Sequence, residues 1–581
     1  MAFLPAQNNG GSFQVDPSGL VTGAVSNPAS DDHDVSPQQW PFDAERDTAR
    51  QRYQVPSIRQ VLRTRLQSSN KETPFLDSLT ELFSGTYLSI PEAGQGTFGA
   101  LQVVKKWLES YFREFHAVSP VIHAPTWKIE NYPTILIAAM SLIGASSATN
   151  GPGKEQLAAL GQLCSKTLPL IAASDTKNYQ DINYLTAHCL SSIYFLGSGD
   201  RQLYQSADRS RGLLIASLRG LGILGSSFTL SMEGERKKTN LNATQNDRQH
   251  HLHQEWLSWR DQQQELRLVW TAFEFDYTFS TLTSKRGAID LSELPTRMPC
   301  ADSLWSAPSA QAWAALQVDM SENMTGVSLA SSLRTVASGK PLPPDLSPYS
   351  RRYLSIVLDR LLWDLKQLDM VFITGCLGLP HSSCGQQERK ENLLEVLRKI
   401  RHSLWRPRST EELINHSLSL NRWHVDSSIK AAERQLAMSF TSDPQKSRSL
   451  IWHAAQIIGI SNQYIICSPC EVLRIFAAYA FLIAHAIYHP RPHPDGPTHA
   501  TVDLAQIYPN ADQMTATNQW IKQGGGAGVG CVTDIWSEEG MQALIREGSE
   551  RLGGIIIWKA AEKFIRALQY FARRDLSSVG I

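Results

Sequence analysis

Apolar residues recur at steps of three and four through most of the chain after residue 56, which is the period of an amphipathic helix. Four stretches carry this pattern most clearly, and each predicts one helix. The residues that set the period are Trp256, Trp259, Leu266, Trp270 and Phe273; Leu354, Leu358, Leu361, Leu365, Leu368 and Phe372; Leu393, Leu397, Ile400 and Leu404; and Ile557, Ala561, Phe564, Leu568 and Phe571. Alternating patterns typical of strands are scarce, so the sequence predicts an all-α fold, a large irregular helical array.

Three regions of different composition follow one another. Residues 1–56 are rich in Gly, Ser, Pro, Asn and Asp and contain no Lys or Arg before Arg46, which predicts a disordered acidic tail. Residues 57–490 are predicted to form a helical domain. Residues 491–581 are predicted to add a loop and C-terminal helices that pack on the same domain. Polar or Pro/Gly-rich stretches at 225–246, 324–351, 406–444 and 490–530 predict loops within the array.

Charge and cysteine content narrow the class of protein. Lys and Arg together number 55, as do Asp and Glu, so the net charge is zero, which does not favour binding to nucleic acid through phosphate neutralisation. The eight cysteines are dilute and absent before Cys164, which argues for a reducing compartment rather than a disulfide scaffold. The longest apolar stretch, at residues 475–488, falls short of the roughly 20 residues that span a bilayer, so no membrane association is expected.

One set of residues has the spacing of a zinc finger. Cys467, Cys470, His485 and His489 form C-x2-C and H-x3-H pairs separated by 14 residues. The intervening run, EVLRIFAAYAFLIA, reads as one continuous buried helix that would hold the two pairs about 21 Å apart. Because zinc ligands lie within about 2.3 Å of one ion, we favour buried thiols beside a core helix over a metal site.

The other polar clusters are more typical of solvated surface than of a catalytic or binding site. The run Asp31, Asp32, His33 and Asp34 has carboxylates of the kind that bind Mg²⁺ in helical prenyl-transferring or terpene-cyclising enzymes, but it lies in the predicted tail and has no second cluster. The same interpretation covers three further groups: the glycine-rich linker at 524–530; the histidines His250, His251 and His253; and the basic runs Arg236, Lys237 and Lys238, and Arg398, Lys399, Arg401, Arg406 and Arg408. The basic runs leave a nuclear-import signal as a second interpretation. We therefore assign no catalytic, cofactor-binding or metal-binding residue, and DNA-binding residues stay unknown.

Residues 111–127, YFREFHAVSPVIHAPTW, resemble the opening of the fungal-specific transcription factor regulatory domain. In that family an aromatic helix precedes a turn with this order of residues. The matching positions are Tyr111, Phe115, His116, Pro120, His123, Pro125, Thr126 and Trp127. The small-residue helix TILIAAMSLIGASS follows, as in the family.

Residues 256–305 resemble the second signature of the same domain. The matching positions are Trp256, Trp259, Glu265, Arg267, Trp270, Phe273, Asp276 and Ser280, then Leu294, Pro295, Met298, Pro299, Cys300, Leu304 and Trp305. The resemblance is strongest to the branch found in two-Cys two-His zinc-finger regulators and covers about residues 85–575. It departs from the family where Tyr277 follows Asp276, at Gln262, Gln263 and Gln264, and in having no zinc module before Cys164.

The large aromatic residues of these signatures predict core positions, and pairing of Glu265 or Asp276 with Arg260 or Arg267 is expected to join adjacent helices. The resemblance implies a nuclear transcriptional regulator, commonly of metabolic or secondary-metabolite gene clusters, that is not an enzyme and needs no cofactor. It would act through protein contacts or be a form that lacks its DNA-binding zinc module. Its expected partners are other transcription regulators, with DNA bound indirectly or weakly. A small-molecule effector and a homo-oligomer are compatible with it. The alternative is an all-α enzyme that acts on an apolar, isoprenoid-like substrate.

Overall fold

The structure, a computed structural model, describes twelve stretches of the chain. They are residues 95–148, 154–225, 245–283, 285–319, 327–338, 346–373, 437–438, 440–463, 469–488, 501–507, 509–555 and 558–572. Within them the fold is helical throughout, apart from two strands of two residues each, so the predicted all-α class is confirmed. The predicted tail at residues 1–56 lies outside the described stretches.

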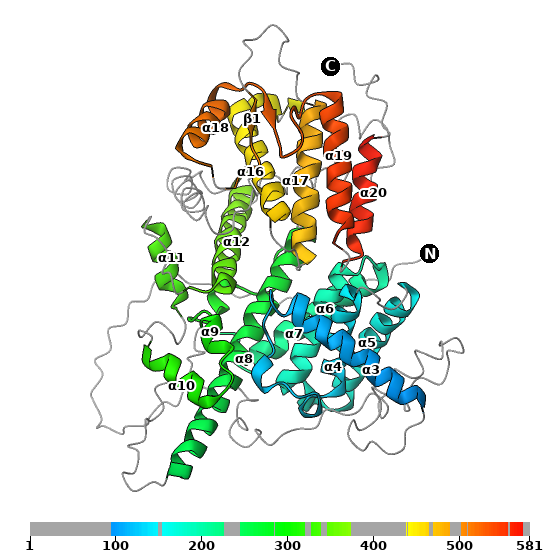
Figure 1. The fold of residues 1–581 in the computed structure, drawn as a ribbon, viewed down its shortest axis with the longest axis vertical. Helices are drawn as coiled ribbons and strands as arrows, with labels where there is room; N and C mark the ends of the chain where they lie inside the picture. Colours follow the sequence, from blue (N-terminus) through cyan, green and yellow to red (C-terminus); the bar gives the residue numbers. More distant parts are fainter. Residues whose placement is uncertain are drawn as a thin grey trace, which may run out of the picture. The chain divides into compact units, whose positions relative to one another are not determined.

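The first group of helices packs around α4 and α6 (Figure 1). Its members are α3 (Gln95–Ser110), the π-helical turn η1 (Tyr111–Phe115), the 3-10 turns η2 (Ala124–Thr126) and η3 (Ile129–Asn131), α4 (Thr134–Ser147), α5 (Lys154–Ser174), the 3-10 turn η4 (Thr176–Gln180), α6 (Ile182–Gly197) and α7 (Arg201–Gly220). Helices α4 and α6 are apolar on all sides, and nearly every residue in them is buried. A helix of that composition is stable only when other helices surround it.

Local signals set where these helices begin. The Asp181 carboxylate accepts a hydrogen bond from the Tyr184 amide, and the Asp200 carboxylate accepts from the amides of Gln202 and Leu203. These N-caps supply partners for donors that the first helical turn leaves free. Asp181 and Asp200 therefore set the N-terminal ends of α6 and α7.

The second group is built on two long helices, α8 and α12, which are drawn in green in Figure 1. Helix α8 (Gln245–Thr283) has 39 residues and α12 (Pro348–Ile373) has 26, and the two helices are in contact. The shorter elements around them are the 3-10 turn η5 (Leu291–Glu293), α9 (Asp302–Trp305), α10 (Ala310–Asp319) and α11 (Leu329–Ala337).

The third group surrounds α17 (Pro469–Tyr488), which packs against α16, α19 and α20. Its other members are α16 (Pro444–Gln463), β1 (Val502–Asp503), α18 (Ala511–Gln523), β2 (Ala527–Gly528), α19 (Glu538–Gly553) and α20 (Ala560–Ala572). Strands β1 and β2 pair in parallel, with Val502 opposite Ala527.

Trp558, which precedes α20, joins the third group to the first. Its ring lies against Gly197 at the end of α6, so closely that a Cβ there would sit 2.3 Å from the indole. It also meets Phe115 edge-on, with 6.5 Å between ring centroids. The exact domain boundaries at residues 490 and 491 stay a prediction.

The predicted helices are confirmed where the structure describes them. The apolar positions from Trp256 to Phe273 are buried on α8, and the stretch 354–372 falls on α12. In the last stretch, Ala561, Phe564, Leu568 and Phe571 fall on α20, whereas Ile557 lies outside the described residues. The stretch 393–404 and residues 406–436 of the predicted loop at 406–444 lie outside the described residues. The described end of that loop is helical at residues 437–438 and 440–442, and α16 begins at Pro444.

Two predicted loops need correction. Residues 324–351 contain α11 and the start of α12, and residues 490–530 contain α18 and the two strands. Helix α18 is largely polar and is fixed by a capping box at Asn510 and Gln513, so composition alone hid it. The glycine-rich stretch 524–530 is an ordered turn rather than a linker, because Gly524, Gly525 and Gly530 adopt positive φ and β2 lies between them.

Candidate functional site

The first signature forms a tight turn against the core. The π-helical turn η1 extends α3 and buries Tyr111 and Phe115. His116 Nε2 lies 2.6 Å from the Ile122 carbonyl oxygen, and His123 Nδ1 lies 2.9 Å from Thr126 Oγ1. Burial lowers the pKa of His116 to about 4 and that of His123 to about 3, so both imidazoles are neutral and serve as hydrogen-bonding parts of the turn.

The second signature builds a separate tryptophan core. Trp256 and Trp259 on α8 pack with Trp305 of α9 and Trp313 of α10 in a cluster distinct from the main core. The closest indole pair is Trp259 and Trp313, with 5.4 Å between ring centroids. The predicted core role of Trp256 and Trp259 is thus confirmed. We call this cluster the tryptophan core.

Arg267 joins the two signatures. Its side chain is fully buried, its Nη2 donates to the Cys300 carbonyl oxygen at 3.1 Å, and its Nη1 donates to the Pro120 carbonyl oxygen at 3.4 Å. Its guanidinium carbon lies 4.5 Å from the Trp305 ring centroid and 5.2 Å from that of Tyr349. Asp302 supplies the opposite charge at 3.7 Å. One arginine therefore contacts the first turn, the tryptophan core and α12.

Beyond Arg267, a row of polar pairs lies buried between α8 and α12, which we call the polar seam. Thr271 Oγ1 lies 3.0 Å from Tyr349 Oη, and Glu274 Oε2 accepts from Arg352 Nη2 at 2.9 Å. Farther along, the Tyr277 hydroxyl donates to the Asp359 carboxylate. The α8 positions follow one another at three-residue steps, so they lie along one face of the helix. The seam fixes the register between the two longest described helices.

Asp276 anchors the loop that follows α8. Its carboxylate accepts three hydrogen bonds of 3.0 Å, from Arg211 Nη1 on α7 and from the amides of Ala288 and Ile289. Burial raises the pKa of this carboxyl, and the two amides and the arginine oppose that rise. Gly287 packs closely beside it, because a Cβ there would lie 2.2 Å from Arg360 Nη1 and 2.7 Å from Asp276 Oδ2.

The sequence predicted such ion pairs, and the partners of Arg267 and Asp276 in the structure differ from those predicted. Arg260 pairs with the adjacent Asp261 at 2.6 Å and joins no second helix through that contact. Arg267 pairs with Asp302, and Asp276 pairs with Arg211. Reasoning from the sequence missed the partners of the seam on α12, Arg352 and Asp359. The available signal was the presence of charged residues inside an apolar helical stripe.

The continuous helix predicted between the zinc-like pairs is confirmed as α17. Cys470 and His485 both belong to α17, whereas Cys467 and His489 lie outside the described residues. His485 is buried among aromatic side chains, and its Nδ1 accepts from Trp536 Nε1 at 3.4 Å. No three His, Cys, Asp or Glu side chains gather into a metal site within the described part of the chain. The expectation that the chain binds no metal stays a prediction.

Of the other polar candidates, some lie within the described residues and some lie outside them. His250, His251 and His253 are exposed on the first turns of α8, in agreement with the solvated helix start that we predicted. The acidic run at 31–34 and the basic runs at 236–238 and 398–408 lie outside the described residues.

Helix α17 corrects the estimate that the apolar stretch at residues 475–488 is too short to span a membrane. The 18 residues Glu471–Tyr488 have a mean hydropathy of 1.4, so by length and composition this helix could cross a membrane. However, 72% of that window is buried against other parts of the protein. Core helices pass the same test, and the contacts of α17 with α16, α19 and α20 are those of a core helix.

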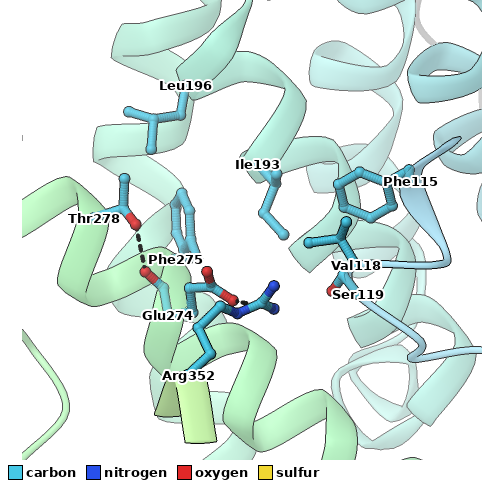
Figure 2. A pocket seen from close by; sticks show the side chains of 9 residues that line it. All are labelled: Phe115, Val118, Ser119, Ile193, Leu196, Glu274, Phe275, Thr278 and Arg352. Atoms are coloured by element: carbon cyan, nitrogen blue, oxygen red, sulfur yellow. Dashed lines mark hydrogen bonds and ion pairs between the residues drawn. The ribbon is translucent and has the colours of Figure 1, made fainter. Parts of the chain in front are cut away.

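A small cavity borders the polar seam (Figure 2). It has a volume of about 20 Å³ and is lined by Phe115, Val118, Ser119, Ile193, Leu196, Glu274, Phe275, Thr278 and Arg352. Pockets for small organic ligands measure roughly 300–1,000 Å³, so this cavity does not by itself supply an effector site.

Two signatures that pack around one arginine, inside a helical array, define a regulatory domain of the fungal transcription factor type. Comparison with known proteins agrees, because the model of the family "Fungal specific transcription factor domain" matches residues 108–405, just over half of the chain. The chain belongs to this family.

Several curated fungal proteins are similar to the chain. The zinc finger protein klf1 of Schizosaccharomyces pombe is 22% identical over 394 residues, which cover 67% of this chain and 47% of the relative. A transcription factor of Gibberella fujikuroi is 22% identical over 372 residues, or 62% of this chain and 45% of the relative. The transcription factor PfmaH of Pestalotiopsis fici is 23% identical over 221 residues, which cover 37% of this chain and 22% of the relative. The chain spans about half the length of the first two relatives, and no solved structure matches it significantly.

Proposed function

We propose that this chain is a nuclear transcriptional regulator of fungal type, not an enzyme, that reaches promoters through contacts with other regulators. The observation that carries the proposal is the packing of both family signatures around Arg267, since this places the residues of the family pattern in one structural unit. Relatives named as transcription factors support the same conclusion.

DNA reading by the chain alone is the weaker part of this function. The net charge is zero, and no cysteine precedes Cys164, so the sequence offers no zinc finger ahead of the family domain. A relative is named as a zinc finger protein, which suggests that a separate module or partner reads DNA. We expect the 581 residues alone to bind duplex DNA weakly and in a salt-sensitive way. Tight binding to one short duplex at physiological salt, measured by fluorescence anisotropy, would contradict this.

The target genes proposed are those of a metabolic pathway, including a secondary-metabolite biosynthetic cluster. This assignment rests on the family resemblance. Transcript profiling of a deletion strain tests it, with loss or gain of co-expressed neighbouring genes as the expected result. Scattered changes without any such group would contradict the cluster role.

Chromatin immunoprecipitation with sequencing tests the regulator itself. The tagged protein is expressed from its native locus, beside a matched strain that carries the exposed-site substitution Arg209→Ala on α7. We expect discrete promoter peaks in both strains. A flat profile in cells that plainly express the protein would remove promoter occupancy and favour a cytosolic partner or the all-α enzyme acting on an apolar substrate.

A further inference from the structure

Two buried polar atoms border the small cavity beside the polar seam. Arg352 and Ser119 both line it, and they are 8% and 5% exposed. Arg352 Nε and Ser119 Oγ have no hydrogen-bond partner among the described residues. A buried N–H or hydroxyl without a partner costs about 1–3 kcal/mol, so native proteins seldom keep such groups unsatisfied.

The geometry around the cavity shows which donor is free. Arg352 Nη2 already donates to Glu274, and the guanidinium lies near the rings of Tyr349 and Tyr353. Its Nε–H therefore needs a hydrogen-bond acceptor from elsewhere. The view in Figure 2 shows the Arg352 side chain beneath Ile193, with Ser119 across from it on the turn after η1. A molecule between them would accept from Arg352 and either donate to or accept from the serine hydroxyl.

The volume selects the ligand. A water molecule needs at least about 10–15 Å³ of such space, together with two to four polar partners. The cavity has about 20 Å³, and the remaining walls are mainly apolar side chains. The space admits water but is too small for an organic effector.

We propose that this cavity is a structural water site, in which one ordered water bridges Arg352 Nε and Ser119 Oγ. The water joins the first family signature to the polar seam. It also completes the hydrogen bonding of the side chain that links α12 to Glu274 on α8. In this arrangement the water adds a link between the turn at residues 116–121 and α12.

Two serine variants of the full chain test the site through stability. Ser119→Ala removes a hydroxyl that the water binds, so the unfolding equilibrium in urea should shift about three- to tenfold toward the unfolded state. Ser141→Ala is the matched control, because the Ser141 hydroxyl is also buried and has no partner among the described residues but does not line the cavity. That variant should be neutral or more stable, since it removes an unsatisfied polar group. Equal effects of the two substitutions would overturn the proposal.

Electron density tests the site directly. In crystals of the full chain at about 2 Å resolution or better, we expect one spherical peak within hydrogen-bond distance of both atoms. A dry cavity, or one that takes up xenon under pressure, overturns the proposal because only an apolar cavity stays dry. Elongated density, as from the carboxylate of a co-purified ligand, would also overturn it, since the acceptor would then not be water.

Discussion

Arg267 stacks on Trp305, with 4.5 Å between its guanidinium carbon and the ring centroid, although the two residues belong to different helices. The contact places a permanent charge at the boundary between the main core and the tryptophan core. The guanidinium donates hydrogen bonds to the backbone carbonyls of Pro120 and Cys300 and forms an ion pair with the carboxylate of Asp302. A buried arginine held from three sides is a stringent constraint on how these segments pack.

Replacing Arg267 should therefore destabilise both signatures together. Arg267→Met places a long apolar side chain in the core but leaves two buried carbonyls without their donor. We expect a loss of about 2–4 kcal/mol in the free energy of unfolding. Urea unfolding followed by tryptophan fluorescence measures it. Arg260→Ala, two turns earlier on α8, is the control and should cost less than about 1 kcal/mol, because its partner Asp261 is exposed and its hydrogen bond to Thr126 Oγ1 is long, at 3.4 Å. Similar losses in both variants would contradict the special role of Arg267.

The ion pair of Glu274 and Arg352 calls for a double-mutant cycle. Their side chains are 10% and 9% exposed, so removing either partner leaves a buried charge, at an expected cost of about 3–5 kcal/mol. The variants are Glu274→Leu, Arg352→Met and the combination. The double variant should be more stable than either single one, because no unpaired charge remains. If the single losses simply add, the two residues are not coupled.

Periodicity was sufficient to predict α8, α12 and α20 but not the partners of these helices. The stripe that includes Trp256 and Trp270 predicted α8 because helical burial repeats locally. The pairing of Glu274 with Arg352 spans 78 residues, and a local repeat contains no information on which helix lies opposite. The family signatures identified Arg267 as important, whereas its contacts with Pro120 and Tyr349 required the structure.

The close approach of α3 and α4 depends on a glycine. A Cβ on Gly144 would lie 1.9 Å from the Trp107 carbonyl oxygen, a backbone atom that cannot move aside. Gly144→Ala should push the helices apart and cost about 1–3 kcal/mol by overpacking. Gly212→Ala on α7 is the matched control, because no neighbouring atom lies within 4 Å of its added Cβ, and it should stabilise by about 0.4–1 kcal/mol. Thermal unfolding separates the two, and a stabilising Gly144→Ala would contradict this packing.

Stability should fall as the pH falls below about 6.5, because three histidines are buried in the neutral form. Burial lowers the pKa of His188 to about 4, and it does the same for His116, to about 4, and for His123, to about 3. In the unfolded chain these groups take up protons near their ordinary pKa of about 6.5, while the folded protein does not. Between that value and the folded pKa, each histidine therefore removes about 1.4 kcal/mol of stability per pH unit. Above pH 7 the contribution is fully present.

Urea unfolding at pH 7, 6 and 5 measures the slope, which His188→Leu should reduce by about one histidine's share and the exposed-site substitution His250→Gln should leave unchanged. A stability that is constant or increases from pH 7 to pH 5 would show that these imidazoles are not held neutral in the folded protein.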